Sequence, residues 1–150
     1  MISTRKALPA EYLIIAQFQE KMAKETEGIR LDPVVVREGV RSVFAEPSKG
    51  CYYVAETDGR VAGSLLITYE WSDWRNGQIL WIQSVYVLPE YRGMGLYSRL
   101  YSHIRQIVED NPNYCGIRLY VDKRNKNALR VYRHCGMDDE HYRLFEWMKA

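Results

Sequence analysis

The chain has 150 residues, a formal net charge of +2 and 47% hydrophobic residues. This length suffices for one domain with a buried core. No apolar run approaches the ~20 residues that a membrane helix needs, and the N-terminus lacks the apolar stretch of a signal peptide. We therefore expect a cytoplasmic protein without a membrane partner. The small, scattered excess of positive charge gives no reason to expect nucleic-acid binding.

Three cysteines, Cys51, Cys115 and Cys135, form no C-x-x-C pair. An odd number of unpaired cysteines is typical of reduced thiols rather than of disulfides or a zinc site. The three histidines show no metal-ligand spacing with the cysteines. We therefore expect no metal cofactor.

Proline, glycine and aspartate residues separate segments whose apolar residues recur with a period of 2, typical of strands, from segments with helical spacing. Asp58-Gly59 predicts a tight hairpin turn, and Pro9, Gly28 and Pro47 mark element ends. The expected elements are a strand (4–8), two amphipathic helices (9–27, 33–46), a hairpin (51–56, 61–69), a polar and aromatic connection (70–77), a strand (79–88), a helix (from about 94–96 to 110), a strand (116–121), a helix (125–135) and a last strand (142–148).

The stretch from Val85 to Leu100 links the strand at 79–88 to the following helix through Arg92-Gly93-Met94-Gly95. Glycines at a helix N-terminus allow close approach of a ligand to the backbone, and the free amides with the helix dipole favour an anion. The motif has neither the Lys-Ser/Thr pair of a P-loop nor the three glycines of a dinucleotide fingerprint. A turn that needs glycine only for its geometry is the alternative interpretation.

This turn resembles motif A of the GNAT N-acetyltransferases, [Q/R]-x-x-G-x-[G/A]. Arg92 and Gly95 match the motif, whereas Tyr97 stands where the family usually has Gly or Ala. A second stretch, from Asn125 through Tyr132 to Met137, is similar to the family pattern N-x-x-A-x-x-x-Y-x-x-x-G-[F/M]. The resemblance covers roughly residues 51–147.

The resemblance implies a single domain over residues 1–150 of mixed α/β (α+β) class. Its central sheet is expected to be mostly antiparallel and flanked by about four helices. Strands 79–88 and 116–121, joined by one crossover helix, are expected to be parallel and to splay apart. The implied activity is direct transfer of an acetyl group from acetyl-CoA to a primary amine, with a small molecule favoured as acceptor.

The resemblance also assigns residues to acetyl-CoA. Splayed strands leave backbone groups that pantetheine can pair with, and the amides of residues 93–98 would hold the pyrophosphate. The expected cofactor-binding residues are Val85, Tyr86, Val87, Arg92, Gly93, Met94, Gly95, Leu96, Tyr97, Ser98 and Asn125.

Two catalytic residues are predicted. The resemblance implies that Tyr132 donates its phenolic proton to the departing thiolate; a core tyrosine is the alternative. Family members often carry a glutamate base at positions that correspond to Trp81 and Tyr120. Glu70 is therefore expected to accept the amine proton, with Asp73 as a second candidate and water held by Gln83 or Ser84 as a relay; the alternative is a solvated loop.

Tryptophans near these carboxylates predict a site for a cationic amine, because aromatic faces and carboxylates both attract cations. A hydrophobic lid or a subunit contact, and hence a homodimer, is the competing interpretation. The expected substrate-binding residues are Trp71, Asp73, Trp74, Trp81 and Gln83.

Three alternatives to the small-molecule enzyme stay open. A non-catalytic acyl-CoA sensor or interaction module would explain the missing glutamates. A protein or peptide N-acetyltransferase would use the same transfer chemistry on a larger acceptor. Nucleic-acid binding through the basic cluster at 123–126 would show steep salt dependence.

Overall fold

The computed structural model describes all 150 residues, which form two compact units, 1–118 and 119–150. The first unit contains a five-stranded sheet and three α-helices, and the second contains one α-helix. None of the helices combines the length and the apolar character needed to cross a membrane. Short 3-10 turns join several elements of the first unit, at Pro9–Glu11, Pro47–Lys49 and Pro89–Tyr91.

The sheet follows chain order from edge to edge. Its strands are β1 (Ser3–Lys6), β2 (Cys51–Thr57), β3 (Arg60–Ser72), β4 (Gly77–Val87) and β5 (Tyr114–Arg118). The first three pairings are antiparallel, and β4 and β5 are parallel. The expected fold class is confirmed.

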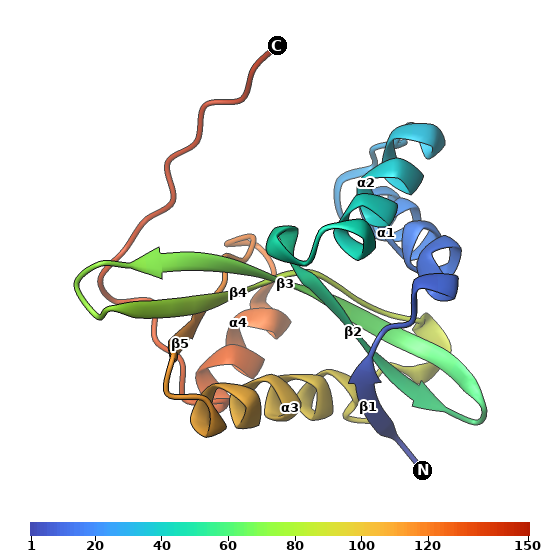
Figure 1. Cartoon of the computed structure of the whole chain (residues 1–150). Helices are drawn as coiled ribbons and strands as arrows, with labels where there is room; N and C mark the ends of the chain where they lie inside the picture. The colour runs from blue at the N-terminus through green and yellow to red at the C-terminus, as the bar shows by residue number, and fades with distance from the viewer. The chain divides into compact units, whose positions relative to one another are not determined.

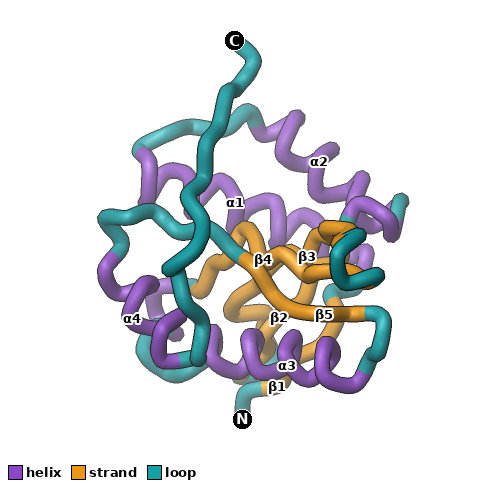
Figure 2. Tube along the Cα trace, turned by 90° about the vertical axis from the view of Figure 1, so that its left-hand side faces the viewer, coloured by secondary structure: helices purple, strands orange, loops and turns teal.

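The sheet of the first unit has helices on both faces. Helices α1 (Tyr12–Glu27) and α2 (Pro33–Ala45) lie on one face and α3 (Leu96–Asp110) on the other (Figure 1, Figure 2). The residues predicted to begin and end the first two helices do so. Asp32 caps α2 by accepting a hydrogen bond from the amide of Val34, and Gly28 ends α1 in the left-handed conformation.

Alternation along the strands builds a separate core on each face. Tyr52 and Val54 of β2 pack with α1 and α2, in a cluster that includes Phe18 and Tyr86. Tyr53, between them, points the other way and lies against His103 of α3, with 5.5 Å between ring centroids. The period of 2 in β2 thus supplies both cores.

Strands β4 and β5 splay apart. Their parallel pairing ends at Trp81 and Arg118, while β4 continues to Val87 with no strand beside it on that edge. A β-bulge lies in the same segment, because Leu66 and Ser64 of β3 pair with Gln83 and Tyr86 of β4. Ser84, within the bulge, has a φ of 53°, in the left-handed region.

The last predicted strand is wrong. In the second unit, helix α4 (Lys126–His134) is followed by residues 137–150 without helix or strand, the red end of the chain in Figure 1. The apolar side chains of the expected strand, 142–148, are exposed; Phe145 is 90% exposed. A strand needs a neighbour for its N–H and C=O groups, and no strand of the sheet pairs with this segment.

Other boundaries also differ from the prediction, and two of these differences bear on the site. Strand β3 continues through Glu70 to Ser72 and β4 begins at Gly77, so half of the expected connection at 70–77 is strand. Strand β5 begins two residues earlier than expected, at Tyr114, and ends at Arg118. Glu70 and Arg118 are therefore both strand residues of the first unit, which matters for the site.

Arg5 links β1 to the turn before α1. Its guanidinium donates to both carboxylate oxygens of Glu11, at 2.9 and 2.8 Å, and to Glu56 at 2.9 Å. The amide of Leu8 also donates to Glu11, at 2.7 Å. The hydrogen bond from Arg5 is the main reason why the pKa of Glu11 is lowered below its ordinary value.

We expect this pair to make stability depend on acid pH. The folded-state pKa of Glu11 lies below its unfolded value near 4.5, so its stabilisation is complete above that pH and is lost as the pH falls through the folded-state pKa. Glu11→Gln should lower the free energy of unfolding by about 1–2 kcal/mol at pH 7, and by less at pH 3. Urea unfolding measures the difference.

Glu38→Gln, which breaks an exposed pair with Arg41, is the control and should change the free energy of unfolding little. An equal loss of free energy from Glu11→Gln at pH 7 and at pH 3 would contradict the assignment.

Candidate functional site

The glycine turn between β4 and α3 has the conformation that the motif predicts. Gly93 and Gly95 have φ values of 80° and 82°, in the left-handed region. A Cβ on either residue would meet nothing within 4 Å, so glycine is needed here for backbone conformation and not for space. Helix α3 then starts at Leu96 with no side-chain cap and no acidic residue in its first turn. Its first amides lack intrahelical acceptors, which favours an anion at this end.

Arg92 ties this turn to helix α1 and to the end of β4. Its Nε donates to the carbonyl of Val87 at 2.9 Å, and its guanidinium pairs with Glu25 at 2.8 Å. The same guanidinium lies over the ring of Tyr86, 5.4 Å from its centroid. The Tyr86 hydroxyl also donates to Glu25, at 3.1 Å. Arg92 thus fixes the position of the turn.

The other residues predicted to bind the cofactor in the first unit offer mainly backbone groups. Val85 and Val87 are half-buried on the open edge of β4, whereas Tyr86 is buried between them. Leu96 is buried in the core, and the Tyr97 ring lies beside Tyr101 on α3, 6.4 Å between centroids. Met94 and Ser98 are exposed.

Glu70 is held by two donors. The indole N–H of Trp81 donates to its Oε1 and Arg118 to its Oε2, both at 2.7 Å. The Trp81 hydrogen bond, followed by that from Arg118, lowers the pKa of Glu70. A carboxylate with a lowered pKa is a weaker base, so this environment suits a fixed negative charge better than a proton acceptor.

These groups form a polar face at the β3–β4–β5 end of the sheet. Register places Thr68 and Glu70 on the side of the sheet that carries α1 and α2. Gln83 donates to Thr68 Oγ1 at 2.5 Å on the same side. We call this set the polar face; its members are Thr68, Glu70, Trp81, Gln83 and Arg118.

Arg118 is the member that the sequence analysis did not identify. It lies 48 residues from Glu70 in the chain, and only the β4–β5 register brings the two together. The available signal was a charged residue in an otherwise apolar strand. Such a residue usually needs a partner.

The remaining residues predicted for substrate lie apart from Glu70. Trp71 follows Glu70 in β3, so alternation turns it to the opposite face, where it is 60% exposed. Asp73 and Trp74 belong to the turn between β3 and β4, and Trp74 is 88% exposed. The three predicted tryptophans therefore do not form one aromatic cage.

The second unit contains the other two predicted residues, Asn125 and Tyr132. Asn125 caps α4, since its side-chain oxygen accepts a hydrogen bond from the amide of Ala128 at 3.1 Å. Tyr132 is half-buried two turns along the same helix. A separation of seven residues places both on one side of α4.

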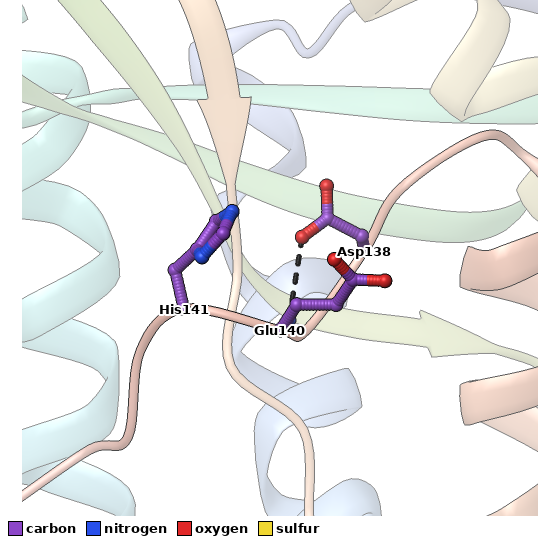
Figure 3. Close-up of side chains that lie close together, drawn as sticks. All are labelled: Asp138, Glu140 and His141. Atoms are coloured by element: carbon purple, nitrogen blue, oxygen red, sulfur yellow. Dashed lines mark hydrogen bonds between the residues drawn. The ribbon is translucent and has the colours of Figure 1, made fainter.

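A group of potential metal ligands also occurs in the second unit. Asp138, Glu140 and His141 bring ligand atoms within 4.8 Å of one another (Figure 3). The amide of Glu140 donates to Asp138 at 3.3 Å, so a local turn accounts for the approach of the two carboxylates. All three residues are exposed, and nothing beyond their proximity points to an ion.

A surface cavity of about 400 Å³ lies at the C-terminal end of α1, where Lys21, Lys24 and Arg30 contribute to its lining. None of the residues predicted for cofactor or substrate lines it.

Comparison with known proteins gives a family match over most of the chain. The model of the acetyltransferase (GNAT) family matches residues 15–137, which include parts of both units. A thialysine N-epsilon-acetyltransferase of Bos taurus is 32% identical over 79 residues, 53% of this chain and 45% of that protein. An uncharacterized N-acetyltransferase of Methanocaldococcus jannaschii is 37% identical over 89 residues, 59% of this chain and 53% of that protein. The chain thus spans about half the length of these curated relatives.

Solved structures agree with the fold. A possible acetyltransferase of Clostridium difficile 630 is 41% identical, with a TM-score of 0.92, and the match covers 100% of this chain and 99% of that one. A predicted acetyltransferase of Clostridium acetobutylicum, crystallised with acetyl-CoA, is 18% identical with a TM-score of 0.75, and the match covers 100% and 96% of the two chains. With its family model, its splayed parallel strands and its glycine turn, the chain belongs to the GNAT acetyltransferase family.

Proposed function

We propose that this protein transfers an acetyl group from acetyl-CoA to a primary amine of a small molecule. One observation carries the proposal. The unpaired edge of β4 leads directly into an uncapped helix N-terminus at the left-handed glycines Gly93 and Gly95. The edge of β4 offers backbone partners for the amides of pantetheine, and the helix N-terminus that follows offers a site for an anion. Pantetheine and pyrophosphate follow one another in the same order along coenzyme A.

In this proposal the cofactor binds largely through backbone. The main chains of Val85 and Val87 pair with the pantetheine amides, and the amides of residues 93–98 hold the pyrophosphate. Asn125 contacts the pantetheine arm through its side-chain NH₂, because its oxygen caps α4. Arg92 serves as a positioning residue through Glu25 and Val87.

The transfer is direct. The neutral amine attacks the thioester carbonyl, a carbon–nitrogen bond forms, and the carbon–sulfur bond breaks to release the thiolate of coenzyme A. Tyr132 donates its phenolic proton to that thiolate, which is the role implied by its place in the second motif. The attacking nitrogen loses a proton to water, the Tyr132 phenolate regains a proton from solvent, and no acyl-enzyme intermediate forms.

Glu70 is the carboxylate proposed to bind the acceptor. Its hydrogen bond from Trp81 places it next to the strand position where family members often carry a glutamate. Because Trp81 and Arg118 lower its pKa, Glu70 stays negatively charged and attracts the acceptor in its ammonium form. The ammonium group loses a proton to water before the neutral amine attacks.

A non-catalytic acyl-CoA-binding module is the second candidate. The absence of glutamate at Trp81 and Tyr120 favours it. A protein or peptide acceptor is a variant of the main proposal, in which a chain end or lysine side chain replaces the small amine.

Thiol release from acetyl-CoA tests these functions. The full chain is mixed with acetyl-CoA and single amines, amino acids or peptides, and free thiol is measured against an amine-free control. Calorimetry measures coenzyme A binding in parallel. Release with small amines supports the main proposal, and release with peptides alone supports the variant. Coenzyme A binding without release from any acceptor would support the sensor.

A further inference from the structure

We propose that Glu25 of α1 is a positioning residue for coenzyme A. Through Arg92 it holds the glycine turn at 93–95 in place, so that the amides at the start of α3 are ready for the pyrophosphate. Glu25 lies 67 residues before Arg92 in the chain and belongs to neither sequence motif. The inference rests on the proposed function for its placement of the pyrophosphate, and it adds the residue that prepares that site.

The Glu25 carboxylate contacts two points of the segment that leads into the turn. Its Oε2 accepts a hydrogen bond from the Arg92 guanidinium at 2.8 Å, and its Oε1 accepts one from the Tyr86 hydroxyl at 3.1 Å. Tyr86 belongs to β4 and is 4% exposed, whereas Arg92 directly precedes Gly93. One side chain of α1 therefore connects a buried residue of β4 with the first residue of the turn.

Buried rings fix the helix that carries Glu25. Phe18 lies seven residues earlier in α1 and thus on the same side of the helix. Its ring packs against that of Tyr86, with 5.2 Å between centroids. Both residues belong to the core cluster beneath α1 and α2. The packing of α1 against β4 therefore gives Glu25 a defined position relative to the turn.

The guanidinium of Arg92 is engaged by groups of β4 and α1. Its Nε donates to the Val87 carbonyl at 2.9 Å, and its carbon lies over the Tyr86 ring, 5.4 Å from the centroid. Its hydrogen bond to Glu25 is the main reason why the pKa of Glu25 is lowered, so the carboxylate stays charged at neutral pH. Arg92 therefore contributes to the conformation of the turn, and the pyrophosphate is left to the backbone amides.

The turn needs support from outside because its own residues provide little. Gly93 and Gly95 are left-handed, and glycine loses more conformational freedom on ordering than any other residue. A turn that is ordered before the ligand arrives binds with a smaller loss of entropy. The side chains of Glu25 and Arg92 are 39% and 47% exposed, so their pair adds little to the stability of the fold. We therefore expect its effect in coenzyme A affinity and not in the unfolding temperature.

The sign of the effect separates this role from simple electrostatics. A carboxylate near the turn repels the pyrophosphate, and its removal would also free the Arg92 guanidinium to bind a phosphate directly. Both of these effects predict tighter binding of coenzyme A when Glu25 is replaced. The positioning role predicts weaker binding.

Glu25→Ala in the full chain tests this prediction. Alanine is the best helix former, so α1 keeps its conformation. Calorimetry should show coenzyme A affinity lowered roughly 3- to 10-fold, the range for loss of a hydrogen bond. Thiol release should show the same rise in KM for acetyl-CoA, with kcat unaltered at saturating acetyl-CoA. Glu27→Ala removes the same charge from an exposed position of the same helix, and it should leave affinity and KM within about twofold.

A double variant shows whether Glu25 acts through Arg92. Arg92→Met alone should weaken coenzyme A binding at least as much as Glu25→Ala. Adding Glu25→Ala to it should cause no further loss, because the shared contact is already gone. Thermal unfolding checks that each variant folds. If Glu25→Ala does not fold, Glu25→Gln takes its place with the same expected sign, since it keeps the length of the side chain and removes the charge.

Unchanged or tighter coenzyme A binding by Glu25→Ala would overturn the inference, and so would an equal loss in Glu27→Ala or additive losses in the double variant. Failure of the proposed function looks different. In that case Glu25→Ala weakens coenzyme A binding as expected, yet no amine releases thiol. Glu25 would then position the turn of a binding module that lacks the transfer reaction.

Discussion

Replacing Tyr132 with phenylalanine is expected to lower kcat by about 10²–10³-fold, the range for loss of a general acid. The change removes one hydroxyl from α4 and keeps the ring. Without it, the thiolate of coenzyme A must leave unprotonated or take a proton from water. Steady-state thiol release with a saturating acceptor measures the effect, and calorimetry should show coenzyme A affinity unchanged within about twofold.

Tyr142→Phe is the matched control, because Tyr142 belongs to the exposed segment after α4 and has no assigned role. It should leave kcat unaltered. Unchanged turnover in Tyr132→Phe would remove the proposed role. A parallel loss of kcat and coenzyme A affinity would instead indicate that Tyr132 holds the cofactor or supports α4.

Much of the fold was predictable because local signals mark the element ends. Asp32 caps α2, Gly28 ends α1, and Asp58-Gly59 forms the hairpin between β2 and β3. Each of these residues acts through its own backbone or that of close neighbours. The glycine turn before α3 belongs to the same class. The confirmed features therefore depend on short-range chemistry that the sequence displays directly.

The polar face could be predicted only in part because it depends on register. Glu70 and Trp81 stood out as a carboxylate and an aromatic residue near one turn, but Arg118 reaches them through the pairing of β4 with β5. The bulge at Ser84 was also hidden, since serine is not a residue that usually adopts a positive φ. Long-range pairing decides both features.

At 142–148 the sequence predicts a strand that the structure does not contain. Its weak alternation of apolar residues indicates a strand, yet the structure leaves the side chains of Phe145 and Trp147 exposed. Alternation shows that a segment has an apolar face, but it does not supply the neighbouring strand that must receive its hydrogen bonds. Pattern alone was therefore insufficient at this end of the chain.

Replacing Gly95 with alanine is expected to weaken coenzyme A binding by about tenfold or more. Gly95 has a φ of 82°, and a left-handed conformation costs a non-glycine residue about 1–2 kcal/mol. The alanine Cβ would meet no atom within 4 Å, so the cost is one of backbone conformation. The turn would relax toward a negative φ, and the first amides of α3 would move away from the pyrophosphate. Calorimetry with coenzyme A measures the change.

Two glycine controls separate loss of the anion site from loss of stability. Gly59→Ala creates the same kind of strain, at a φ of 73°, in the β2–β3 hairpin turn. It should lower the unfolding free energy by a similar amount and leave coenzyme A affinity intact. Gly39 lies within α2 with open space around a new Cβ, so Gly39→Ala should raise the free energy of unfolding by about 0.5–1 kcal/mol.

If Gly95→Ala binds coenzyme A as the unaltered chain does, the amides after Gly95 do not hold the pyrophosphate. If Gly59→Ala weakens binding equally, the loss reflects general destabilisation, because only Gly95 lies at the N-terminus of α3.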